Sequence, residues 1–184
     1  MLPAHSPTSN PPTLPIPFQI QFQTVNGYLK HRFGQRGLRI WRLLLIEHYL
    51  QAEHIEREAM INTRDVRRHV YAMLKAGFVT IQEIPKSAEH APSKTIYTYG
   101  VVYNDTKTQL VGDLYKAAGN LLARSKAELE REGTILELAN RKGRGDAIKM
   151  SAAQLQAATR LQSVVRALHC SLLSVADMLL TMSM

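Results

Sequence analysis

The stretch that decides the fold is residues 63–84, TRDVRRHVYAMLKAGFVTIQEI. Its first half repeats apolar residues at helical spacing, namely Val66, Val70, Met73 and Leu74. Gly77 follows at the position where helices end, because glycine adopts a left-handed backbone there without strain. From Phe78 onward, apolar and polar residues alternate with period two, which is typical of a half-buried strand. We therefore predict a helix over 63–76 and a strand over 78–84.

Two further helices are predicted upstream of this stretch. The first carries a broad apolar stripe over 38–49, and Gly34 and Gly37 mark a loop before it. A shorter helix fits residues 52–60, and its inward-facing residues are Ile55, Ala59 and Met60. Asn62 and Thr63 can accept hydrogen bonds from the free N–H groups of the third helix, and Asp65 suits its positive first turn.

A β-hairpin is predicted downstream of the third helix. Pro85 ends the first strand, residues 86–94 form a polar turn, and residues 95–102 are a second β-rich run. Three helices followed by a hairpin is the order of a winged helix, which we predict for residues 38–102 within a domain spanning 26–103. The expected fold class is mainly α with a small β-hairpin wing.

The two ends of the chain differ from this block. Six prolines lie within residues 1–17, so we expect residues 1–25 to be a disordered tail, with a short strand at Phe18, Ile20 and Phe22 as the alternative. Residues 104–184 are predicted to form a long antiparallel helical hairpin or coiled-coil stalk. Its second helix begins near Ser151 and repeats apolar residues every seven positions, at Leu161, Leu168, Val175 and Met182.

The overall composition narrows the class of partner. Lys and Arg number 23 against 15 Asp and Glu, which leaves a net charge of +8 and favours anionic partners such as nucleic acid or an acidic protein surface. Cys170 is the single cysteine, so no intrachain disulfide is possible, and a reducing compartment is expected. We find no signal peptide and no apolar run as long as a membrane span, and we expect no membrane partner.

Basic residues of the predicted third helix are the candidate site. They lie away from its apolar stripe, on the face that enters the DNA major groove in helix-turn-helix proteins. Two further lysines flank the predicted wing, where they can reach backbone phosphates. The candidate DNA contacts are Arg64, Arg67, Arg68, Lys75, Lys86 and Lys94. The alternative is a solvated charged face on a winged helix that docks onto protein.

Motifs for catalysis are absent from the sequence. It contains no GxxxxGK[ST], GxSxG or HExxH pattern, and no GxGxxG follows a predicted strand. The seven histidines do not have the spacing of a zinc site. We therefore predict no catalytic residue, no metal, no cofactor and no small-molecule substrate.

A family resemblance lies in residues 78–99, FVTIQEIPKSAEHAPSKTIYTY. This run is similar to the C-terminal region of the large winged-helix subunit of RNA polymerase III. The most telling parts are Gln82–Lys86 (QEIPK) and His90–Ser93 (HAPS) followed by a basic residue and an aromatic-rich strand. The upstream run Arg39–Leu44, RIWRLL, also fits, whereas the downstream helical hairpin agrees in kind only.

The resemblance implies a non-catalytic subunit in the nucleus. Members of that family form a heterotrimer on the polymerase clamp and act in promoter opening and initiation of transfer RNA and 5S ribosomal RNA synthesis. Their full-length forms carry several winged helices before a helical stalk, so we expect this chain to correspond to the last winged helix and the stalk. The implied partners are other polymerase III subunits and promoter DNA bound without sequence specificity. The alternative is a stand-alone dimeric winged-helix regulator of transcription.

Overall fold

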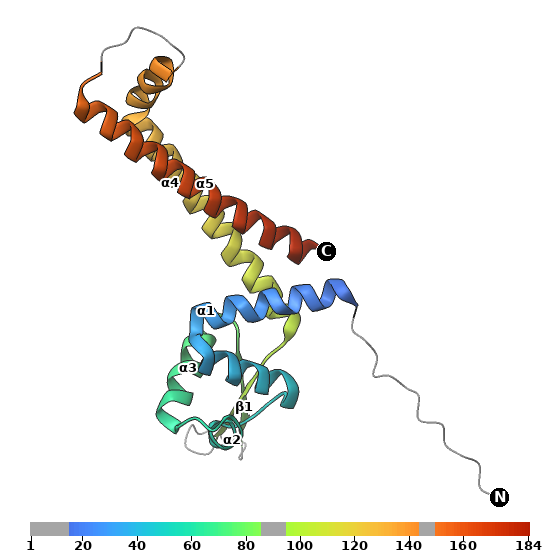
Figure 1. Ribbon diagram of the computed structural model, residues 1–184. Coiled ribbons are helices and arrows are strands. Elements are labelled where there is room, and N and C mark those ends of the chain that lie inside the picture. Colours follow the sequence, from blue (N-terminus) through green and yellow to red (C-terminus); the bar gives the residue numbers. More distant parts are fainter. Residues whose placement is uncertain (1–14, 86–94, 144–149) are drawn as a thin grey trace, which may run out of the picture. The chain divides into compact units, whose positions relative to one another are not determined.

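The computed structural model describes residues 15–85, 95–143 and 150–184. Within these residues seven elements follow one another, and the chain divides into two compact units (Figure 1). The first unit ends at Lys107, and the second runs from Thr108 to Ser183. The elements are α1 (Ile16–Glu47), α2 (Ala52–Ala59), α3 (Thr63–Lys75), β1 (Thr80–Pro85), β2 (Thr95–Gly100), α4 (Tyr103–Gly143) and α5 (Ala152–Ser183).

Helix α1 begins far earlier than expected, so the prediction of a disordered tail or short strand is wrong for residues 16–25. Two prolines stand at its start: Pro15 is the N-cap and Pro17 lies in the first turn, where the missing N–H has no helical partner to lose. Phe18 and Phe22 then lie one turn apart on the same face, with ring centroids 6.3 Å apart. Residues 1–14 lie outside the described part of the chain.

A kink at Gly34 divides α1 into two helical segments. Its φ of 75° and ψ of 179° fall in a region that is essentially open to glycine alone. The loop predicted around Gly34 and Gly37 is thus reduced to this single residue, since Gly37 is helical and buried.

The core of the first unit is built from the apolar stripes of its three helices. Trp41 lies at its centre with no exposed surface, and its indole Nε1 donates a hydrogen bond to Thr106 Oγ1 at 3.3 Å. The ring of Phe22 lies 6.2 Å from that of Trp41, so the early part of α1 belongs to this core. Other fully or nearly fully buried side chains are Val25, Leu29, Ile40, Leu44, Ile55, Val66, Val70 and Met73.

Helices α2 and α3 keep the predicted order, with one correction. Met60 was expected to face inward, but it adopts a left-handed conformation at the C-cap of α2 and is 87% exposed. The chain turns there, and Asn62 then caps α3 by accepting a hydrogen bond from the Asp65 N–H at 2.8 Å. At the other end of α3, Gly77 has a φ of 78°, as the sequence predicted.

The wing is a two-stranded antiparallel sheet in which Thr80 pairs with Gly100 and Pro85 with Thr95. Strand β1 starts two residues later than predicted, because the Phe78 N–H donates to the Met73 carbonyl at the end of α3 and pairing with β2 begins only at Thr80. Strand β2 likewise ends at Gly100, before Val101 and Val102. Leu50 forms a single antiparallel bridge with Tyr99, which extends the sheet on its β2 side. The turn predicted over residues 86–94 lies outside the described residues.

The second unit is a helical hairpin in which α5 lies back along α4 (Figure 1). Helix α4 begins at Tyr103, one residue before the predicted start of the hairpin at residue 104, and continues past Gly133 to Gly143. The Oγ of Ser151 accepts a hydrogen bond from the Gln154 N–H at 3.2 Å and thereby caps α5, with Gln154 Oε1 accepting one from the Ser151 N–H at 2.9 Å.

The predicted seven-residue repeat of α5 coincides with its covered face: Leu161, Leu168 and Met182 are buried and Val175 is half-buried. Helix α5 also carries apolar side chains outside this face, among them the exposed Leu173 and Leu180. An 18-residue window of the helix reaches a mean hydropathy of 1.4, which makes it long and apolar enough for a membrane span by length and composition alone. Only 6% of that window is buried, so much of its apolar surface is uncovered within the described chain.

Candidate nucleic-acid interface

Four predicted contact residues form one exposed stripe on α3. Arg64, Arg67, Arg68 and Lys75 are exposed, and all lie away from the buried residues of the helix. Their spacing of three, one and seven residues places them along one helical face. We call these four residues the α3 basic face. Lys86 and Lys94, the two wing candidates, lie outside the described residues.

The α3 basic face retains its positive charge in the folded chain. The acidic residue of α3, Asp65, forms an ion pair with Arg36 of α1. Within residues 15–85, 95–143 and 150–184, no salt bridge engages Arg64, Arg67 or Arg68. These guanidinium groups are therefore available to an anionic partner.

The histidine of α3 does not add to this charge. Burial lowers the pKa of His69 below its usual value, and the nearby Arg68 and Arg36 lower it further, whereas Asp65 opposes the shift. A histidine with a lowered pKa is neutral near pH 7. The positive charge of the face consequently comes from its three arginines and its lysine.

A groove runs from the α3 basic face to strand β2. It consists of two adjoining hollows of about 200 and 380 Å³, and Ala52, Arg67 and Tyr99 line both. Tyr71 of α3, which is 68% exposed, lines the first, and Tyr97 of β2, which is 38% exposed, lines the second. A guanidinium group beside tyrosine rings suits both phosphate contacts and stacking on bases.

Sequence reasoning did not include the tyrosines of β2 among the candidate contact residues. The available signal was the alternation of TIYTYG, which places Tyr97 and Tyr99 on the same face of the strand. What the sequence does not reveal is that this face lies next to Arg67, because that proximity arises from the packing of β2 against α3.

Side chains that could ligate a metal are scattered among the described residues. These residues contain no group of three or more His, Cys, Asp or Glu side chains that could hold a metal ion. Cys170 is exposed on α5, away from the winged-helix unit in sequence.

Three helices, a β-hairpin and a basic third helix together define a winged-helix domain with a candidate nucleic-acid interface. Residues 25–101 match the family described as "POLR3C, C-terminal winged-helix domain". The resemblance to the RNA polymerase III winged-helix subunit, predicted from the sequence of the wing, is thereby confirmed, and so is the winged-helix fold.

Relatives from distant organisms carry the same name. The chain is 37% identical over 118 residues to "DNA-directed RNA polymerase III subunit RPC3" of Danio rerio. This matched stretch makes up 64% of this chain and 22% of that protein. The human subunit of that name is 35% identical over 118 residues, which again make up 64% of this chain and 22% of that protein. The Dictyostelium discoideum subunit is 32% identical over 118 residues, which make up 64% of this chain and 18% of that protein. The chain thus spans about a fifth of the length of these relatives.

Proposed function

We propose that this chain acts as a non-catalytic part of DNA-directed RNA polymerase III in the nucleus. It takes part in promoter opening and initiation of small-RNA synthesis, including transfer RNA and 5S ribosomal RNA. The single observation that carries the proposal is the match of residues 25–101 to the C-terminal winged-helix domain of that subunit. The name shared by relatives at 32–37% identity supports it.

The partners in this proposal are other polymerase III subunits and promoter DNA. Exposed arginines on α3 favour contact with phosphates, which fix position but carry no sequence information. The DNA contact is therefore non-sequence-specific. The second candidate, a stand-alone dimeric regulator, has support in the seven-residue repeat of α5, but three of the four residues of that repeat are buried in the chain itself. The polymerase relatives favour the first function.

A transcription assay tests the role in promoter opening. Polymerase III assembled with the Arg64→Ala/Arg67→Ala/Arg68→Ala variant is compared with the wild-type enzyme on a small-RNA gene, either fully duplex or with a pre-opened bubble at the start site. We expect transcription from the duplex to fall roughly tenfold or more, because three phosphate contacts are lost. Transcription from the bubble should be nearly unchanged, since opening is no longer required.

The control for this assay is Lys116→Ala/Lys126→Ala/Arg166→Ala, which removes three positive charges from exposed positions of the hairpin instead. An equal loss on both templates would contradict a role in opening and would indicate that the α3 basic face serves catalysis or assembly.

A further inference from the structure

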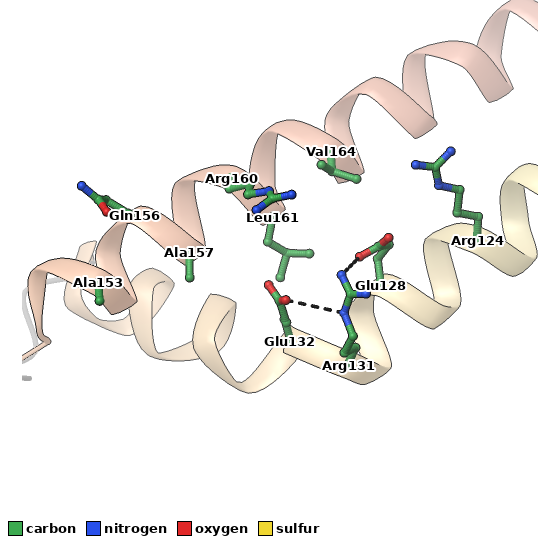
Figure 2. A pocket seen from close by; sticks show the side chains of 10 residues that line it. All are labelled: Arg124, Glu128, Arg131, Glu132, Ala153, Gln156, Ala157, Arg160, Leu161 and Val164. Carbon is green, nitrogen blue, oxygen red and sulfur yellow. Dashed lines mark hydrogen bonds and ion pairs between the residues drawn. The ribbon is translucent and has the colours of Figure 1, made fainter.

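A hollow of about 500 Å³ lies inside the helical hairpin, between α4 and α5 (Figure 2). We call it the hairpin hollow. Both helices contribute to its wall, and every residue that lines it belongs to the second unit. The lining residues are Arg124, Glu128, Arg131 and Glu132 of α4, and Ala153, Gln156, Ala157, Arg160, Leu161 and Val164 of α5.

The hollow exists because the residues at the contact between α4 and α5 are small or charged there, and not large and apolar. In a coiled coil, large apolar side chains fill the seam. Helix α5 provides Leu161 at this point but only Ala153 and Ala157 in the preceding turns, and α4 provides the partly covered glutamates Glu128 and Glu132. Small residues beside charged ones do not fill the space, so the seam stays open.

The two glutamates are engaged by one arginine. Arg131 Nη2 lies 2.6 Å from Glu128 Oε2, and Arg131 Nε lies 3.5 Å from Glu132 Oε1 (Figure 2). The lining holds three arginines against two glutamates, which leaves a net charge of +1. The negative groups of the hollow are therefore already neutralised in part from within the hairpin.

The other two arginines of the lining, one on each helix, are not engaged by these glutamates. In Figure 2, Arg124 extends from α4 towards α5, and Arg160 lies on α5 above Leu161. Both are exposed, and neither forms a salt bridge within the described residues. An anionic group seated in the hairpin hollow would meet one guanidinium from each helix.

We propose that the hairpin hollow is a docking site for an acidic amphipathic helix of a partner protein. Its carboxylates pair with Arg124 and Arg160, and its small or apolar residues lie over Ala153, Ala157 and Val164. Charge complementarity identifies the partner as acidic, and the open seam provides the space for its side chains. The mostly uncovered apolar surface of α5 is a second reason to expect a protein against this unit.

A helix fits the hairpin hollow better than nucleic acid does. A phosphate backbone carries a charge at every step, so phosphates would lie near Glu128 and Glu132. A helix repeats its contacts every three or four residues, so it can place carboxylates at the two arginines and uncharged residues over the glutamates. The proposal uses the hairpin alone and does not rest on the function proposed for the winged helix.

The test measures binding of a synthetic helix to the full chain. The probe is a fluorescent peptide about 20 residues long, roughly 30 Å as a helix, with glutamates at i, i+4 spacing on one face and alanine and leucine elsewhere. The comparison peptide has glutamine in place of each glutamate. We expect saturable binding of the acidic peptide alone, measured by fluorescence anisotropy. Arg124→Glu/Arg160→Glu should weaken it roughly tenfold or more, because two attractive pairs become repulsive.

The matched control is Arg166→Glu, an exposed arginine of α5 that does not line the hairpin hollow. It should leave the affinity nearly unchanged, and circular dichroism should show the same helix content for all variants. The proposal is overturned if the acidic peptide does not bind, if the glutamine peptide binds equally well, or if Arg166→Glu weakens binding as much as the double variant. Tighter, Arg124-dependent binding to duplex DNA or to anionic vesicles would also overturn it.

Discussion

Replacing Trp41 by alanine is expected to lower the free energy of unfolding of the winged-helix unit by about 3–5 kcal/mol. The side chain is fully buried and joins three segments: the early part of α1 through Phe22, its own segment after the kink, and the start of α4 through Thr106. Small domains are stable by only about 5–15 kcal/mol, so this loss is a large share of the total. Urea unfolding followed by far-UV circular dichroism measures it, because the variant has no tryptophan left to report.

Two further variants calibrate that result. Trp41→Phe keeps an aromatic ring but loses the hydrogen bond to Thr106 and part of the volume, so it should cost less than the alanine variant. Ile46→Ala, on the same helix but 72% exposed, should change the stability by less than about 0.5 kcal/mol. A Trp41→Ala loss as small as that of Ile46→Ala would show that the packing around Trp41 is not the core.

The second large effect is expected from Arg67→Ala/Arg68→Ala on binding to duplex DNA. If both side chains contact phosphates, the slope of log affinity against log salt should fall by about 1.8, since each contact contributes roughly 0.9. Relative to wild type, the affinity should drop roughly 60-fold at 0.1 M salt. Arg64 and Lys75 remain in this variant, so binding is weakened and not abolished.

The matched control for that measurement is Lys126→Ala/Arg166→Ala, which removes the same charge from exposed positions of the hairpin. Its salt dependence should resemble that of the wild type if the contact is local to α3. An unchanged slope for Arg67→Ala/Arg68→Ala, together with weaker recovery of partner subunits, would reassign the α3 basic face to protein docking.

Local signals in the sequence were sufficient for the centre of the winged helix. Asn62 and Gly77 predicted both ends of α3, because capping and left-handed termination depend on the residue at one position. The alternation of apolar and polar residues after Gly77 predicted the first strand of the wing, because this pattern too is contained in a few consecutive residues. These features need no knowledge of distant contacts.

The early part of α1 could not be predicted from composition, because the effect of proline on a helix depends on its position in that helix. Inside a helix it breaks the hydrogen bonding, yet at the start it is well tolerated, and Pro15 and Pro17 both stand at the start. The alternation of Phe18, Ile20 and Phe22 also suggested a strand, whereas the helix uses the four-residue spacing of the two phenylalanines.

The three candidate surfaces differ in how far the sequence alone reveals them. The α3 basic face follows from helical periodicity on a single element, so its residues could be named in advance. The α3–β2 groove and the hairpin hollow each require two elements to be packed against each other. Ala157 and Glu132, for example, are ordinary helix residues until α5 lies back along α4.

The central claim is that this chain works as part of RNA polymerase III, and co-purification tests it most directly. The tagged chain is expressed in its own cells, recovered under mild salt, and the bound proteins are identified by mass spectrometry. The account predicts stoichiometric recovery of polymerase III subunits, including the largest subunit, and none specific to the other nuclear polymerases. Recovery of the chain as a homodimer that binds duplex DNA without polymerase subunits would contradict it.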